Sequence, residues 1–179
     1  MIVRAVGRAG FRARFGAGRR ALAGALASVV LGCVLAGCVA TLPSDPEGTL
    51  DDVRGGVLRV GVSTAPLWTE PGPADDGGPA GLEPDLVRAF AQSLDAEVEW
   101  TRGGEEQLVD QLHRDELDLV VGGLTASSPW ADTAALTYPY AHTVGPEGAP
   151  QAHVMAVRLG ENAFMVELER FLLAQEVRP

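Results

Sequence analysis

The chain has 179 residues and a formal net charge of −10, and residues 38–179 carry all 24 acidic side chains but only eight of the 14 arginines, a charge of −16. Such a balance excludes nucleic acid and anionic lipid headgroups as electrostatic partners. Cys33 precedes this acidic part and Cys38 is its first residue, and the three histidines lack metal-ligand spacing, so we predict no disulfide, no metal site and no cofactor.

The first 37 residues have the pattern of an export leader. Six arginines precede an uncharged apolar run at 21–37, which leads into Leu35-Ala36-Gly37-Cys38. This tetrapeptide resembles the lipobox of bacterial lipoproteins, whose cysteine is acylated and becomes the mature N-terminus. The resemblance implies a signal peptide at 1–37, lipidation of Cys38 and a lipid-anchored domain on the extracytoplasmic side of the cell membrane. An uncleaved signal anchor is the alternative, and it exports the domain as well.

The remaining sequence predicts a tether at 38–48 and a single α/β domain at 49–179. Apolar β-branched runs predict strands at 57–62, 96–100, 117–121, 136–140 and 154–157. Amphipathic spacing predicts helices at 49–53, 84–94, 105–114 and 161–175. Helices between successive strands indicate a largely parallel sheet with right-handed crossovers.

Local signals refine these elements. Thr49, three residues before Asp52, predicts a capping box at the start of the first helix. Glu83 and Asp85 are interpreted as acids that complement the dipole at a helix N-terminus. The Gly- and Pro-containing residues 141–152 predict a linker.

The order of these segments resembles the first lobe of a family 3 bacterial extracellular solute-binding protein, the receptor component of amino-acid ABC importers. The matching segments are LRVGV (58–62), PLW (66–68), GLEPDL (81–86), AFAQSL (89–94), QLVDQLHRDELDLVVGGLT (107–125), TYPY (137–140) and HVMAVRLGENAFMVELERFLLA (153–174). The resemblance implies one lobe of a type II periplasmic-binding-protein fold, with an open, mostly parallel sheet of four to five strands flanked by helices. The chain is also similar to the substrate-binding-like module of membrane-bound lytic transglycosylase F. That enzyme's catalytic domain has no counterpart in this sequence, so we predict no enzymatic activity and no catalytic residue.

Two departures from the family pattern bear on function. Family members clamp ligand between two lobes, whereas here the second lobe is missing between 141 and 152. Amino-acid binders in the family also carry a G-x-T-x-T-x-x-R loop, whose arginine holds the ligand carboxylate. Trp130 occupies the place of that arginine, which argues against α-amino-acid binding.

The candidate site follows from the rule that ligands of open α/β sheets lie beyond the carboxyl ends of the strands. This rule selects loop residues after the first three strands: Trp68, Glu70, Glu105, Gly123, Thr125, Ser127 and Trp130. Trp68, Trp130 and Glu105 would frame a cation between ring faces and a carboxylate. Alternatively, the two tryptophans form a surface for a partner protein.

These observations predict a membrane-anchored, extracytoplasmic solute-binding-like lipoprotein. It would serve as an ABC-transporter accessory, with an ABC permease or another membrane protein as partner, and would bind a small polar or cationic solute weakly. The alternative is a protein-interaction or sensory lipoprotein that has lost ligand binding.

Overall fold

The computed structural model describes residues 43–72, 78–145 and 148–177, which belong to a compact unit spanning Leu42–Pro179. The predicted signal peptide and Cys38 lie outside the described residues. Within the described ranges, no helix is both long and apolar enough to cross a membrane. The same residues include no cluster of His, Cys, Asp or Glu side chains that could hold a metal ion.

A five-stranded mixed sheet, ordered β2-β1-β3-β7-β4, forms the centre of the unit. Its strands are β1 (Val57–Val62), β2 (Glu97–Arg102), β3 (Leu119–Val121), β4 (Ala135–Leu136) and β7 (Ala156–Val157). The β1 strand pairs in parallel with β2 and β3, whereas the short β7 runs antiparallel to both β3 and β4. The predicted α/β lobe is thus confirmed, and its last two strands are shorter than the sequence indicates.

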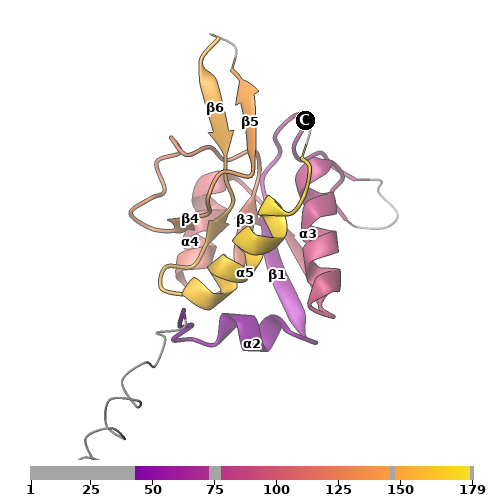
Figure 1. Ribbon diagram of the computed structural model, residues 1–179, viewed down its shortest axis with the longest axis vertical. Coiled ribbons are helices and arrows are strands. Elements are labelled where there is room, and N and C mark those ends of the chain that lie inside the picture. The colour runs from indigo at the N-terminus through magenta and orange to yellow at the C-terminus, as the bar shows by residue number, and fades with distance from the viewer. Residues whose placement is uncertain (1–42, 73–77, 146–147, 178–179) are drawn as a thin grey trace, which may run out of the picture. The chain divides into compact units, whose positions relative to one another are not determined.

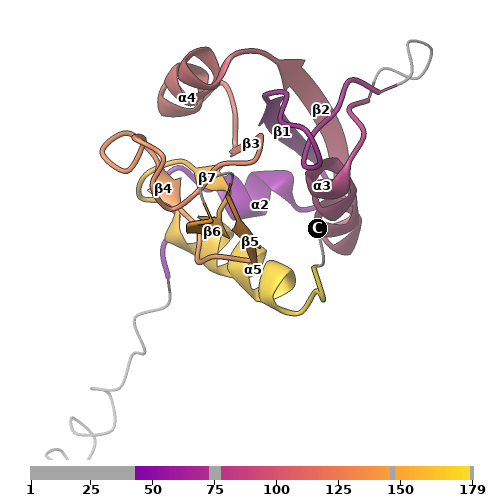
Figure 2. The same ribbon diagram turned by 90° about the horizontal axis from the view of Figure 1, so that it is seen from above.

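Helices cover both faces of this sheet (Figure 2). They are α2 (Thr49–Val53), α3 (Leu82–Ser93), α4 (Glu105–His113) and α5 (Asn162–Leu173). The α2, α3 and α5 helices share one hydrophobic core with β1, while α4 packs in a separate core on the other face. Gly61 faces the α4 core, where an added Cβ would lie 2.8 Å from Leu117 Cδ1 and 3.1 Å from Leu108 Cδ2 of α4, so a larger residue would displace these side chains.

The predicted linker at 141–152 is wrong, because this segment folds as a β-hairpin. Strands β5 (Ala141–Val144) and β6 (Pro150–His153) pair antiparallel and extend from the end of the unit opposite α2 (Figure 1). The Gly145 amide donates to Ala149 O across the turn, and Pro150 occupies the first position of its strand, where a missing amide is tolerated. Gly and Pro therefore mark a turn here rather than a linker.

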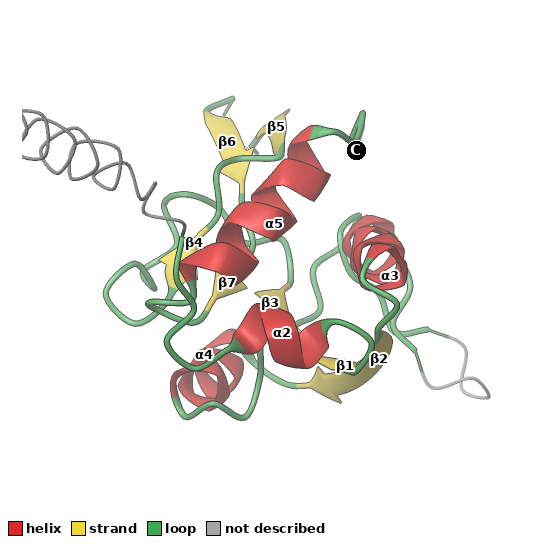
Figure 3. Ribbon diagram, turned by 60° about the horizontal axis from the view of Figure 1, so that its bottom comes forward, coloured by secondary structure: helices red, strands yellow, loops and turns green. Residues whose placement is uncertain are grey.

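The predicted capping box at Thr49 is also wrong, because Gly48 is the N-cap of α2 and Thr49 lies within the helix. The Thr49 side chain is buried and donates to Glu161 Oε2 at 2.6 Å. Glu161 also accepts the amides of Glu47 and Thr49, both at 3.0 Å. These hydrogen bonds hold the start of α2 against Glu161, the residue that precedes α5 (Figure 3).

Asp45, in the segment predicted as a tether, caps two helices at once. Its Oδ2 accepts the Leu50 amide of α2 at 3.0 Å, and its Oδ1 accepts the Ala163 and Phe164 amides of α5 at 2.6 Å and 3.0 Å. These amides have no partner within their own helices, so a carboxylate that reaches both stabilises both ends. The described part of the predicted tether is therefore bound to the domain.

We expect Asp45→Ala to lower the free energy of unfolding by about 2 kcal/mol, because it removes the cap of two helices. Urea unfolding followed by circular dichroism measures this loss. Asp51→Ala, at a side chain that is 90% exposed, is the control and should change stability by no more than about 0.5 kcal/mol. Equal effects of the two substitutions would contradict the capping role.

Candidate functional site

Two consecutive glycines start the loop that follows β3. Gly122 and Gly123 have φ of 152° and 69°, and a Cβ on Gly122 would lie 1.8 Å from Ser63 Oγ. A Cβ on Gly123 would lie 3.1 Å from Trp68 Cδ1. Both the backbone conformation and the space therefore require glycine, which brings the loop after β3 against the loop after β1.

Glu83, in the first turn of α3, hydrogen-bonds to both of these loops. Its side chain is fully buried, and its Oε2 accepts the Gly123 amide at 2.9 Å. The other oxygen, Oε1, accepts the Tyr140 hydroxyl at 2.6 Å. The interpretation of Glu83 as a helix-dipole residue is therefore incomplete, because its carboxylate hydrogen-bonds to two other segments of the chain.

Trp68, in the loop after β1, packs in the same cluster. It is only 7% exposed, and its ring stacks on His153 with the centroids 3.9 Å apart. Tyr140 meets the indole edge-on at 6.1 Å. His153 Nε2 hydrogen-bonds with Thr143 Oγ1 at 2.8 Å, so the stack reaches into the hairpin. Trp68 thus forms part of the buried floor of the edge and presents little of its ring to solvent.

The loop that carries Thr125 and Ser127 lies beside the hairpin. Thr125 pairs with His153 in an antiparallel bridge, and the Ala126 amide donates to Ala152 O at 2.8 Å. The hydroxyls of Thr125 and Ser127 are 2.9 Å apart. Because Ser127 is exposed and Thr125 half-buried, this hydroxyl pair lies at the surface of the edge.

Glu105 and Trp130 form the second pair of predicted site residues that the structure brings together. Glu105 begins α4, and its Oε2 accepts the Trp130 indole N–H at 3.0 Å. Both residues are half-buried. The indole therefore fills the loop position expected for arginine and holds a carboxylate beside it.

Glu70 lies apart from these two pairs. Its backbone pairs with Ala80 in both directions, at 2.8 Å and 2.9 Å, and its side chain is exposed. It lines a cavity of about 30 Å³ that also contacts Ser63 and Thr64, roughly the volume of one water molecule. This cavity is too small for an organic solute.

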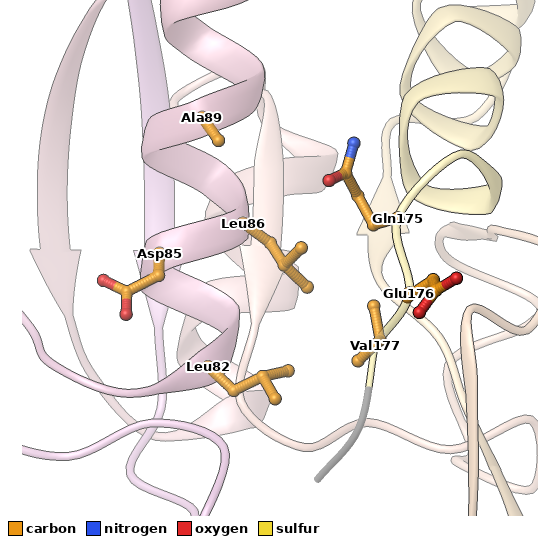
Figure 4. Close-up of a pocket in the computed structure, with 7 residues that line it drawn as sticks. All are labelled: Leu82, Asp85, Leu86, Ala89, Gln175, Glu176 and Val177. Atoms are coloured by element: carbon orange, nitrogen blue, oxygen red, sulfur yellow. The ribbon is translucent and has the colours of Figure 1, made fainter.

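A larger cavity lies elsewhere. About 400 Å³ of space separates the first turns of α3 from the segment after α5 (Figure 4). Leu82, Leu86 and Val177 point into this space, and none of the predicted site residues lines it. The predicted site is consequently an open edge rather than an enclosed pocket.

Burial sets the charge state of the cluster beneath the edge. Burial raises the pKa of Glu83 to about 6, although hydrogen bonds from Tyr140 and from the Gly123 and Gly122 amides act to lower it. Burial also lowers the pKa of His153, and the neighbouring His142 adds to that effect. Both the neutral imidazole and the neutral carboxyl are therefore favoured by folding.

The family model for bacterial extracellular solute-binding proteins, family 3, matches residues 58–173. The chain belongs to this family. Among curated relatives, the membrane-bound lytic murein transglycosylase F of Vibrio cholerae is 35% identical over 100 residues, which are 55% of this chain and 18% of the relative. The same enzyme of Thiobacillus denitrificans is 35% identical over 103 residues, 57% of this chain and 20% of that protein. The chain thus spans about a fifth of the length of these curated relatives.

Solved structures of binding proteins share the fold. The arginine-bound form of domain 1 from TmArgBP has a TM-score of 0.55 and 22% identity over 73% of this chain and 96% of that one. An ancestral cationic amino acid solute-binding protein has a TM-score of 0.59 and 14% identity over 69% and 92%. An arginine-specific periplasmic binding protein of Salmonella typhimurium gives 0.55 and 12% over 65% and 91%. At these identities the likeness establishes the fold alone.

Three buried residues at this edge were absent from the predicted site: Glu83, Tyr140 and His153. Glu83 and Tyr140 lie in the segments GLEPDL and TYPY, which resemble the family, and their positions there are the signal that sequence reasoning could have used. His153 carried no such signal, because its role depends on a hairpin that was predicted as a linker.

The raised pKa of Glu83 implies a pH dependence of stability. Between about pH 4.5 and 6 the folded chain holds a proton that the unfolded chain has released, so the contribution of Glu83 is complete below pH 4.5 and is lost as pH rises through 6. We expect wild-type protein to lose about 2 kcal/mol relative to Glu83→Gln over this interval. Urea unfolding of both proteins across the pH series measures the difference, in which the titration of His153 cancels.

Glu161→Gln is the matched control, because Glu161 is a buried glutamate whose pKa is lowered. Burial acts to raise that pKa, but hydrogen bonds from Thr49 and Glu47 and the charge of Arg158 outweigh it. Its contribution is present above its unfolded pKa and is lost as pH falls, the reverse of Glu83. A flat difference between wild type and Glu83→Gln would contradict the assignment.

Proposed function

We propose that this chain is a membrane-anchored, extracytoplasmic solute-binding lipoprotein that binds a small cationic solute at the open edge of its sheet. The observation that carries the proposal is the Glu105–Trp130 pair, which occupies the place of the carboxylate-binding arginine expected from the family pattern. A carboxylate held against an indole attracts cations and repels the carboxylate of an amino acid.

The other edge residues supply polar contacts for such a solute. The Thr125 and Ser127 hydroxyls can each donate or accept a hydrogen bond, which suits an ammonium or guanidinium and a neutral polar group equally. Trp68 and Gly123 form the floor that supports this loop. Residues 38–179 carry a net charge of −16, which also favours cations over anions.

An open edge binds more weakly than a closed cleft, because a solute there stays largely hydrated on its outer side. One lobe is nevertheless a reasonable platform, because a similar structure, domain 1 from TmArgBP, is described in an arginine-bound form. We therefore infer binding in the micromolar to millimolar range and a role as an accessory to an ABC permease or another membrane protein.

A sensory or protein-interaction lipoprotein is the second candidate. The similarity to membrane-bound lytic murein transglycosylase F favours it, because the matched region of about 100 residues is there only one part of a larger protein with another activity. The exposed β5–β6 hairpin offers such a protein a contact surface. Neither candidate involves catalysis by this chain.

The solute proposal predicts a ligand order and the residue that sets it. Calorimetric titration should show that agmatine, which lacks a carboxylate, binds more tightly than arginine, because Glu105 repels the carboxylate of the amino acid, and that glutamate does not bind. Glu105→Gln should weaken agmatine about tenfold through the loss of charge, while its amide oxygen still accepts the Trp130 N–H.

Glu106→Gln is the control for this experiment. Glu106 is an exposed neighbour in the same first turn of α4, so its substitution changes the net charge equally without touching Trp130. Failure of both cations to bind at 10 mM, or equal losses in the two variants, would refute the site.

The anchoring proposal is tested at Cys38. Cys38→Ala should abolish incorporation of radiolabelled palmitate and release the chain from the membrane fraction, whereas Cys33→Ala should leave both unchanged. Membrane retention of unlabelled Cys38→Ala would favour an uncleaved signal anchor instead.

A further inference from the structure

Glu83 hydrogen-bonds to three segments at the carboxyl end of the sheet through its carboxylate and its backbone amide. Its carboxylate accepts from Gly123 and from Tyr140, and its backbone N–H donates to Trp68 O at 3.1 Å. Gly123 begins the loop of Thr125 and Ser127, and Tyr140 immediately precedes β5 of the hairpin. The solute edge and the hairpin therefore share one buried acceptor.

We propose that Glu83 is a positioning residue that couples the solute loop to the hairpin, so that the two segments open and close together. This inference deepens the proposed function and rests on it for the identity of the solute loop. Glu83 itself is fully buried and would not touch the solute.

The physical basis is the cost of an unsatisfied buried acceptor. If the loop lifts and withdraws the Gly123 amide, the buried Glu83 carboxylate keeps fewer donors, and the closed arrangement of the loop and Tyr140 around it loses stability. Movement of Tyr140 has the same effect on Gly123. A second path runs from Glu83 through Trp68, whose ring stacks on His153 at the end of β6. Both paths lead from the solute loop to the hairpin.

The protonation state of Glu83 changes the free energy needed to open the solute loop and the hairpin. The groups that act on its carboxylate are the Tyr140 hydroxyl and the Gly122 and Gly123 amides, and His153 is the further titratable group in the chain of contacts. Opening exposes the carboxylate to water and lowers its pKa, so by linkage protonation favours the closed arrangement. The solute loop and the hairpin should consequently spend less time open at pH 5 than at pH 7.

Hydrogen exchange of single amides, followed by NMR without any ligand, tests the coupling. Tyr140→Phe removes a hydroxyl at the hairpin base and leaves the Gly123 donor intact. We expect it nevertheless to speed exchange of the Gly123 amide about tenfold at pH 7, because Glu83 has lost a donor. Tyr138→Phe, at a residue that is 65% exposed, is the matched control and should change nothing. Faster exchange in the hairpin alone, with Gly123 unaffected, would overturn the proposal.

The pH response provides a second readout that a merely structural role would not produce. After correction for intrinsic rates, exchange of the wild-type Gly123 amide should slow as pH falls from 7 to 5, whereas Glu83→Gln should show no such response. A wild-type rate that is independent of pH would also overturn the proposal, and this measurement needs no variant that might fold poorly.

Arginine then separates the coupling from the choice of solute. At 10 mM it should slow exchange of the Tyr140 amide, which bonds to His153 O at 3.0 Å, in wild type but not in Glu83→Gln. If arginine binds neither protein, the proposed solute is wrong, while the effect of Tyr140→Phe on Gly123 still decides the coupling. If arginine binds both proteins and slows Tyr140 equally, Glu83 is not the link.

Discussion

A buried carboxylate must be surrounded by hydrogen-bond donors, and this constraint organises the carboxyl end of the sheet. Glu83 enters the core because α3 packs its first turn against the sheet, and the groups that hydrogen-bond to its carboxylate are a hydroxyl and backbone amides. Its donors come instead from the loop after β3 and from Tyr140, while Trp68 accepts its backbone N–H. Burial of one helix turn therefore fixes the loops on which a solute would rest.

The opposite end of the domain uses the same chemistry. Asp45 accepts amides from α2 and α5, Glu161 accepts amides of Glu47 and Thr49, and Asp118 Oδ2 accepts the Arg59 amide at 2.9 Å. The acidic composition suggests mainly solubility when it is considered as sequence. In the structure, several of these acids satisfy backbone groups that would otherwise lack partners, which is a structural reason for carboxylates at those positions.

The sequence predicted the elements that local patterns determine. The β-branched run at 57–62 and the apolar spacing of α3, α4 and α5 are visible within single segments, and those elements form close to the expected bounds. The hairpin was missed because its strands lack apolar alternation and owe their place to pairing with Thr125 and Tyr140. Glu83 was assigned to its own helix because its partner Gly123 lies 40 residues away. By contrast, two of the three residues predicted to frame a cation, Glu105 and Trp130, are in contact, since the carboxyl ends of the parallel strands lie at one edge, whereas Trp68 is buried against His153.

The hairpin also explains how this edge of the sheet keeps its aromatic side chains away from solvent. A two-stranded sheet alone is marginally stable, so β5 and β6 depend on what their base contacts. That base consists of Tyr140 and His153, which enclose the Trp68 ring together with the glycine loop. The hairpin thus covers the aromatic surface that would otherwise be exposed, and the covered surface in turn holds the hairpin in place. The contacts of Tyr140 and His153 with Trp68 do not include Thr125, Ser127 or the Glu105–Trp130 pair. The edge therefore keeps polar groups available to solvent while the apolar side chains beneath it stay buried.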